Sequence, residues 1–155
     1  MSSIYNSFDT FHKAPSGAVR AGQAVTFTLR VPGEFGCTTP YLALHRDGEE
    51  PSLLALHAVL CGQGGAHMPD GQALFTITVP MPQPGLYFYY FDLYTGYRKL
   101  YRGALGEAYI TTGTGEEYQL TVYEAGFSTP SALKGGVMYQ IFPDRFLEGR
   151  PKPMP

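Results

Sequence analysis

The sequence predicts an all-β protein built as an antiparallel β-sandwich. Charged residues make up only 15% of the 155 residues, while glycine (19), proline (13), tyrosine (12) and phenylalanine (10) are abundant. This composition favours short strands joined by turns over helices. About seven or eight strand-like segments recur at roughly ten-residue spacing, and none of the intervening sequence has the period of an amphipathic helix. Together these observations are typical of a sandwich of immunoglobulin-like proportions.

Four segments of the first half are expected to be strands. Residues 4–11 are short and aromatic, and we expect an edge strand there. Residues 24–31 alternate between apolar and polar side chains, so one face should be core and the other solvent. Residues 41–46 follow, and the pair Asp47-Gly48 then predicts a tight turn. Residues 53–60 are nearly all apolar; alone they could be a helix segment, but their length and position favour a strand.

The second half contains three further strands and one hairpin partner. Residues 72–79 alternate again, and residues 118–123 form the last alternating segment. Residues 85–94 are the most aromatic stretch, with aromatic side chains on both faces, which indicates a central strand. Residues 97–103 are expected to return from it as a hairpin partner. Residues 103–115 are rich in glycine, and we expect them to be irregular.

The aromatic stretch also supplies the candidate binding residues. Sugars present flat, weakly apolar faces edged with hydroxyl groups, so exposed aromatic rings beside polar side chains make a natural sugar platform. The candidates are Tyr87, Tyr89, Phe91, Tyr94 and Tyr97. The alternative is that these rings fill the core of the sandwich, since aromatic side chains bury large areas.

Other chemistry is missing from the sequence. The histidines lack metal-ligand spacing, no glycine-rich loop has phosphate-binding context, and no motif marks a nucleophile. The 11 basic residues are scattered, which argues against a nucleic-acid or membrane surface. Cys37 and Cys61 are expected to be free thiols. No signal peptide is visible at the N-terminus, so we expect a cytoplasmic protein.

A resemblance to a known family rests mainly on residues 139–146, which read Tyr-Gln-Ile-Phe-Pro-Asp-Arg-Phe after a Leu-Lys-Gly-Gly lead-in. This run resembles the first barrel strand of the α-amylase family, glycoside hydrolase family 13, which includes neopullulanases, cyclomaltodextrinases and maltogenic amylases. The preceding sequence, with Pro-Ser-Gly-Ala-Val-Arg-Ala-Gly at residues 15–22, resembles the N-terminal starch-binding module of such enzymes, carbohydrate-binding module family 34.

The resemblance implies a division of the chain. Residues 1–126 would form the starch-binding-like sandwich, residues 127–136 a linker, and residues 137–155 the start of a catalytic (β/α)8 barrel whose remainder is missing. Residues 137–142 would then be an orphan first barrel strand. The parent enzyme would be a retaining hydrolase of α-glucosidic bonds, with catalytic carboxylates on later barrel strands. We therefore assign no catalytic residue here, and the resemblance implies a structural role for Asp144.

Two departures from the family limit what the resemblance implies. Relatives often follow Asp-Arg-Phe with an Asn-Gly-Asp calcium loop, whereas residues 147–152 read Leu-Glu-Gly-Arg-Pro-Lys; we therefore expect no calcium or other cofactor. The chain also has no tryptophan, the strongest sugar-stacking side chain. Three roles stay open: binding an α-glucan, acting as a dimerisation and active-site-capping module of a homodimer, or serving as a spacer. The expected partners are an α-glucan, the missing barrel and a second copy of the chain.

Overall fold

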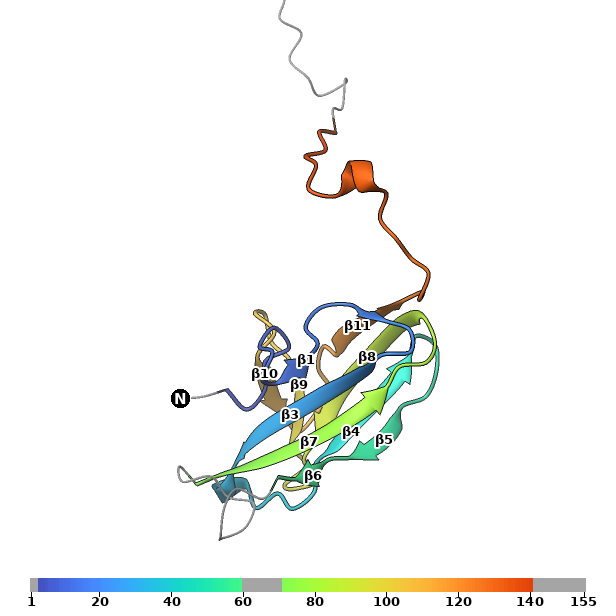
Figure 1. Cartoon of the computed structure of the whole chain (residues 1–155). Helices are drawn as coiled ribbons and strands as arrows, with labels where there is room; N and C mark the ends of the chain where they lie inside the picture. The colour runs from blue at the N-terminus through green and yellow to red at the C-terminus, as the bar shows by residue number, and fades with distance from the viewer. Residues whose placement is uncertain (1–2, 60–70, 141–155) are drawn as a thin grey trace, which may run out of the picture.

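The computed structural model describes residues 3–59 and 71–140. Within these residues the regular structure consists of β-strands and two 3-10 turns, η1 (Gly33–Phe35) and η2 (Ser131–Leu133). The prediction of an all-β fold is therefore confirmed. The strands form a four-stranded and a seven-stranded sheet that enclose one hydrophobic core, which makes the fold a β-sandwich (Figure 1). Its immunoglobulin-like topology stays a prediction.

The four-stranded sheet faces the viewer in Figure 1 and has the order β1-β3-β7-β6. Its long strands, β3 (Ala24–Pro32) and β7 (Gln72–Pro80), pair antiparallel along their whole length. The short strands β1 (Lys13–Ala14) and β6 (His57–Ala58) flank them. The alternation predicted for residues 24–31 is confirmed, because the apolar side chains of β3 are buried and its threonines face outward.

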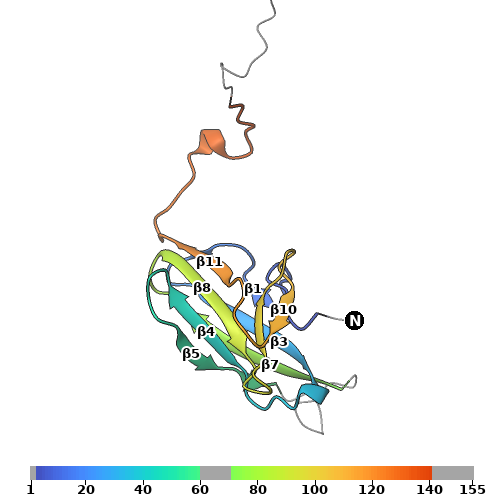
Figure 2. The same ribbon diagram turned by 180° about the vertical axis from the view of Figure 1, so that it is seen from behind.

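The seven-stranded sheet, brought to the front in Figure 2, is built around β8 (Gly85–Asp92). One edge of β8 pairs with β4 (Tyr41–Arg46), which in turn pairs with β5 (Ser52–Ala55). The other edge carries two strands placed end to end, β11 (Tyr118–Tyr123) and β9 (Lys99–Arg102). The remaining strands lie outside these two: β10 (Ala108–Thr111) pairs with β9, and β2 (Val19–Arg20) pairs parallel with β11.

Aromatic rings fill the middle of the core. Tyr89 of β8 stacks on Tyr118 of β11, with ring centroids 5.1 Å apart, and contacts Phe27 of β3 edge-on. The buried hydroxyl groups find partners, as such groups must: the Tyr5 and Tyr89 oxygens lie 2.8 Å apart, and the Tyr118 hydroxyl donates to the Glu107 carbonyl at 3.1 Å. Burial raises the pKa of all three tyrosines well above the ordinary value.

Three segments differ from the prediction. The apolar run from residue 53 onward is divided between the sheets: β5 joins the seven-stranded sheet, buried Leu56 lies at the crossing, and β6 joins the four-stranded sheet. Residues 4–11 form turns and a single bridge to Glu107 instead of a strand, since Tyr5 leaves the surface to enter the core. Glycine-rich residues 103–115 contain a strand, β10, which the sequence pattern did not reveal.

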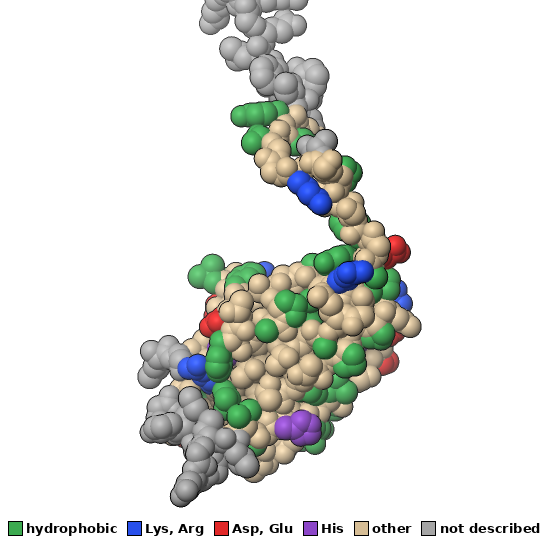
Figure 3. All heavy atoms as spheres, in the orientation of Figure 1, with side chains coloured by type: hydrophobic (Ala, Val, Ile, Leu, Met, Phe, Trp, Pro, Cys, Tyr) green, Lys and Arg blue, Asp and Glu red, His purple; other side chains and the backbone are tan. Residues whose placement is uncertain are grey.

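Beyond β11 the chain leaves the sandwich (Figure 1). Apolar side chains, green in Figure 3, lie along this segment. Val137, Met138 and Tyr139 are among the exposed ones. The barrel strand predicted for residues 137–142 is not formed over residues 137–140, and the remainder of it, with Asp144, lies outside the described residues. The domain boundaries at residues 126 and 136 stay predictions. In the described ranges, the structure contains no helix of the length and apolar character needed to span a membrane.

Candidate functional site

The five predicted binding residues divide between the inner face of the seven-stranded sheet and the turn that follows β8. Tyr89 and Phe91 lie on the inner face with 0% of their surface exposed, so a ligand at the surface cannot reach them. For these two residues the core alternative holds, and their assignment as binding residues is wrong. Tyr87 lies on the same inner face at the rim of the core, with its hydroxyl donating to the Gln83 carbonyl at 3.0 Å. These three residues lie on the inner face because side chains alternate strictly along β8, which directs residues 87, 89 and 91 toward β3.

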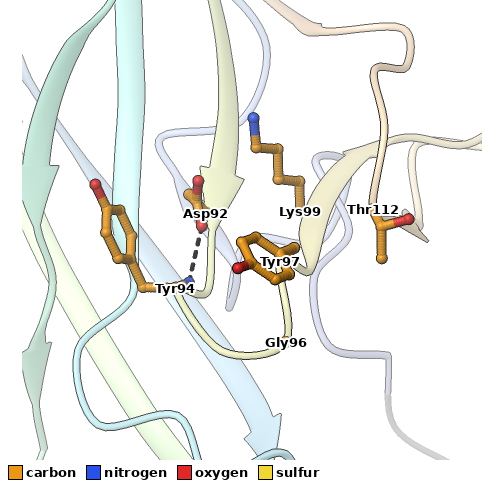
Figure 4. A pocket seen from close by; sticks show the side chains of 6 residues that line it. All are labelled: Asp92, Tyr94, Gly96, Tyr97, Lys99 and Thr112. Carbon is orange, nitrogen blue, oxygen red and sulfur yellow. Dashed lines mark hydrogen bonds between the residues drawn. The ribbon is translucent and has the colours of Figure 1, made fainter.

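Tyr94 and Tyr97 are the two predicted residues that are available to a ligand. Both lie in the turn between β8 and β9, and 66% and 85% of their respective surfaces are exposed. They border a pocket of about 610 Å³, which we call the tyrosine pocket. In Figure 4, Tyr94 lies on one side of Asp92, and Tyr97 and Lys99 lie on the other. The tyrosine pocket is lined by Asp92, Tyr94, Gly96, Tyr97, Lys99 and Thr112.

The turn that carries both tyrosines has a strained backbone. Tyr94, Gly96 and Tyr97 have φ angles of +53°, +60° and +57°, in the left-handed region that suits glycine and costs other residues roughly 1–2 kcal/mol each. The strand ends hold this shape. The Asp92 carboxylate accepts the Tyr94 N–H at 2.8 Å, and the Leu93 N–H donates to the Arg98 carbonyl at 3.0 Å. Backbone strain of this kind is concentrated at binding and catalytic sites.

The strain predicts that a smaller residue at position 97 stabilises the fold. We expect Tyr97→Asn to raise the free energy of unfolding by about 1 kcal/mol, because asparagine tolerates positive φ and the exposed tyrosine ring loses little packing. Urea denaturation measures the change. Tyr139→Asn is the matched control, since Tyr139 is 87% exposed without positive φ, and should stay within about 0.5 kcal/mol of the wild type. A Tyr97→Asn variant less stable than the wild type would contradict the claim that the tyrosine backbone at position 97 is strained.

Two more tyrosines lie on the outer side of the sheet beside the pocket, half-buried Tyr90 and buried Tyr101. Tyr90 of β8 stacks on Tyr101 of β9, with ring centroids 4.9 Å apart and ring planes 22° apart. The Lys99 ammonium lies 5.4 Å from the Tyr90 ring centroid, and Tyr41 of β4 packs against Tyr94 at 4.9 Å. Burial raises the pKa of Tyr90 and Tyr101 above the ordinary value. Tyr90 was not predicted as a binding candidate; the signal was its place at a position of β8 that alternates with core residues. Tyr101 is buried and supports the Tyr90 ring from beside it.

The tyrosine pocket can bind a hydroxylated ligand. Its exposed rings offer flat apolar surface. A carboxylate, an ammonium group and a hydroxyl from three chain segments offer both hydrogen-bond donors and hydrogen-bond acceptors. In the described part of the chain, no group of three or more His, Cys, Asp and Glu side chains is placed to hold a metal ion.

Comparison with known proteins places the chain in context. No protein-family model matches it. The chain is 31% identical over 151 residues to an amylopullulanase of Thermoanaerobacter thermohydrosulfuricus, and 33% identical over 151 residues to one of Thermoanaerobacterium thermosulfurigenes. An amylopullulanase of Thermoanaerobacterium saccharolyticum is 32% identical over 153 residues. Each match covers 94% of the chain.

The chain is homologous to a segment of amylopullulanases. It spans only about a tenth of the length of these relatives, from 8% to 11%. Because the match to amylopullulanases covers nearly the whole chain, it takes in most of the sandwich and does not rest on the Tyr-Gln-Ile-Phe-Pro-Asp-Arg-Phe run alone.

Proposed function

We propose that the sandwich is the non-catalytic, α-glucan-binding accessory domain of an α-glucan-acting glycoside hydrolase of the α-amylase family. The observation that carries the proposal is the exposure of Tyr94 and Tyr97 beside the polar side chains of the tyrosine pocket. The homology to amylopullulanases supports an α-glucan as the ligand.

The chemistry of an α-glucan fits this pocket. The flat faces of glucose rings stack on Tyr94 and Tyr97, and the hydroxyl groups at their edges exchange hydrogen bonds with Asp92, Lys99 and Thr112. The strained turn is fixed by hydrogen bonds before any ligand arrives. Such preorganisation lowers the entropy cost of binding, so a small site of a few rings can retain a sugar chain.

Binding without hydrolysis follows from the carboxylates at the pocket. A retaining glycosidase uses two carboxyl groups about 5–5.5 Å apart across the bond that is cleaved. Among the described residues that line the tyrosine pocket, Asp92 is the one carboxylate, and one of its two oxygens accepts the Tyr94 N–H. The hydrolytic groups of the parent enzyme would lie on a catalytic domain outside this sandwich.

Calorimetric titration with maltoheptaose tests the proposal. We expect the wild-type domain to bind, and Tyr97→Ala to weaken the affinity by about tenfold or more, because buried aromatic contacts dominate the energy of small interfaces. Tyr139→Ala is the matched control, since it removes a ring of nearly equal exposure away from the pocket and should leave the affinity unchanged. A wild-type domain that binds no maltoheptaose would refute the proposal.

The alternative of a dimerisation and capping module makes a different prediction for the same variants. The exposed rings of Tyr94 and Tyr97 would then lie in a protein interface. Sedimentation would show a concentration-dependent dimer that Tyr97→Ala dissociates, together with no response to maltoheptaose. We expect the opposite result on both counts.

A further inference from the structure

We infer that the outer face of the seven-stranded sheet carries a second sugar-contact site, and that one α-glucan chain runs from the tyrosine pocket to it. This inference rests on the proposed function. The second site, which we call the Phe88 site, is a hollow of about 380 Å³ over β8. It is lined by His45, Asp47, Phe88, Arg102, Glu116, Glu117 and Gln119.

Strand register places the two sites on one surface. Asp92, at the tyrosine pocket, pairs with Lys99 of β9, and Phe88 pairs with Gln119 of β11. Residues 88, 90 and 92 alternate with the buried residues 89 and 91, so all three side chains point away from the core. Four residues of strand separate Phe88 from Asp92, which is about 13 Å at 3.3 Å per residue. The separation is therefore longer than a single glucose ring.

The Phe88 site has the construction of a sugar-binding surface. The His45 ring lies beside the half-buried Phe88 ring, with centroids 5.8 Å apart and planes 31° apart. The imidazole is fixed by Glu117, whose Oε2 lies 2.7 Å from Nε2 of His45. Arg102 is held by Glu116. An aromatic floor is thus surrounded by polar groups that are already ordered, with the exposed Gln119 amide at the edge.

Tyr90 lies between the two sites. It occupies the outward position of β8 between Phe88 and Asp92, is half-buried, and stacks on the buried ring of Tyr101. On its other side Tyr90 pairs with Ala43 of β4, which is completely buried. A sugar chain crossing from one site to the other would pass over the half-buried ring of Tyr90.

The charges of this face select a neutral polymer. Carboxylates and basic groups occur at both ends, Asp92 with Lys99 at the tyrosine pocket and Glu116 with Arg102 at the Phe88 site. A polyanion would be repelled by the carboxylates, and its charges would find no excess of basic groups to neutralise them. A neutral glucan gains hydrogen bonds to both kinds of group and carries no charge that must be desolvated.

Chain length separates the two-site inference from the proposed function. We expect the wild-type domain to bind maltoheptaose about tenfold or more tightly than maltotriose, because only the longer chain reaches both sites. Gln119→Ala and Phe88→Ala should each reduce that ratio while leaving maltotriose affinity at the tyrosine pocket unchanged. Gln119 is exposed, so its variant keeps the fold even if Phe88→Ala does not. Gln83→Ala, an exposed glutamine between β7 and β8, is the control and should keep the full ratio.

The outcomes distinguish the two claims. One outcome would overturn the second site and leave the proposed function standing. In it, the wild type binds both sugars with equal affinity, Tyr97→Ala abolishes the binding, and Gln119→Ala does not affect it. No binding of either sugar by the wild type would overturn both.

Discussion

Above pH 10 the sandwich is expected to lose stability steeply and then unfold. Tyr5, Tyr89 and Tyr118 are buried, and burial raises the pKa of each of them far above the ordinary value of 10.0. The unfolded chain releases these three protons near pH 10, whereas the folded chain retains them. Each tyrosine then removes about 1.4 kcal/mol of stability per pH unit, so the three together remove about 4 kcal/mol by pH 11.

The sign follows from the direction of the shifts. A group with a raised folded-state pKa contributes its full stability below the unfolded pKa and loses that contribution as the pH rises. Buried Lys13 acts in the opposite direction, since desolvation lowers its pKa from 10.5, but it is one group against three. Urea denaturation at a series of pH values from neutral to about 11 measures the loss. Stability that stays constant across this range would contradict the burial of the tyrosines.

Replacing Tyr89 by alanine is expected to lower the free energy of unfolding by about 3–5 kcal/mol, the cost of removing a large aromatic side chain from a packed core. Tyr89 is completely buried and contacts the rings of Tyr5, Phe27 and Tyr118. Because the free energy of unfolding of a small domain is roughly 5–15 kcal/mol in total, this variant should be close to complete unfolding in mild denaturant. A loss below about 1 kcal/mol would mean that the ring is not part of the core.

The hydroxyl group of Tyr89 can be tested separately. Tyr89→Phe leaves the buried Tyr5 hydroxyl without its partner at 2.8 Å, and should cost about 1–3 kcal/mol. Tyr87→Phe is the matched control: it makes the same change on the same face of β8, but at an exposed hydrogen bond, and should cost less than about 0.5 kcal/mol. Combining Tyr5→Phe with Tyr89→Phe should recover part of the loss, since both polar groups then leave the core.

The sequence predicted the long strands well, because their periodicity reflects burial directly. The bounds of β4 and β11 agree with the predicted residues 41–46 and 118–123, and β3 differs by one residue at its end. The strands β1, β2 and β6 are two residues long, so no period of two can be recognised in them. They exist because longer strands offer them free edges, which is information that no local pattern contains.

The candidate site was harder to predict than the fold. Both faces of β8 are aromatic, so its pattern could not show whether Tyr89 or Tyr90 points into the core. The answer depends on β3, which lies 60 residues away along the chain and covers the face of Tyr89. Tyr94 and Tyr97 were predicted at the ends of the strands 85–94 and 97–103, whereas both lie in the turn between β8 and β9, and their strained backbone has no signature in the sequence. Tyr41 reaches the same surface only through the pairing of β4 with β8.

The most direct test of α-glucan binding is a two-dimensional NMR titration of the chain with maltoheptaose. Backbone amide signals report which residues meet the sugar, without any substitution. The proposed function predicts that the largest shifts fall on residues 92–97, Lys99 and Thr112, around the tyrosine pocket. The threonine-rich outer face of β3 and β7, on the opposite sheet, should show none. Shifts confined to that opposite face, or no shifts at millimolar sugar, would contradict a glucan-binding role for the tyrosine pocket.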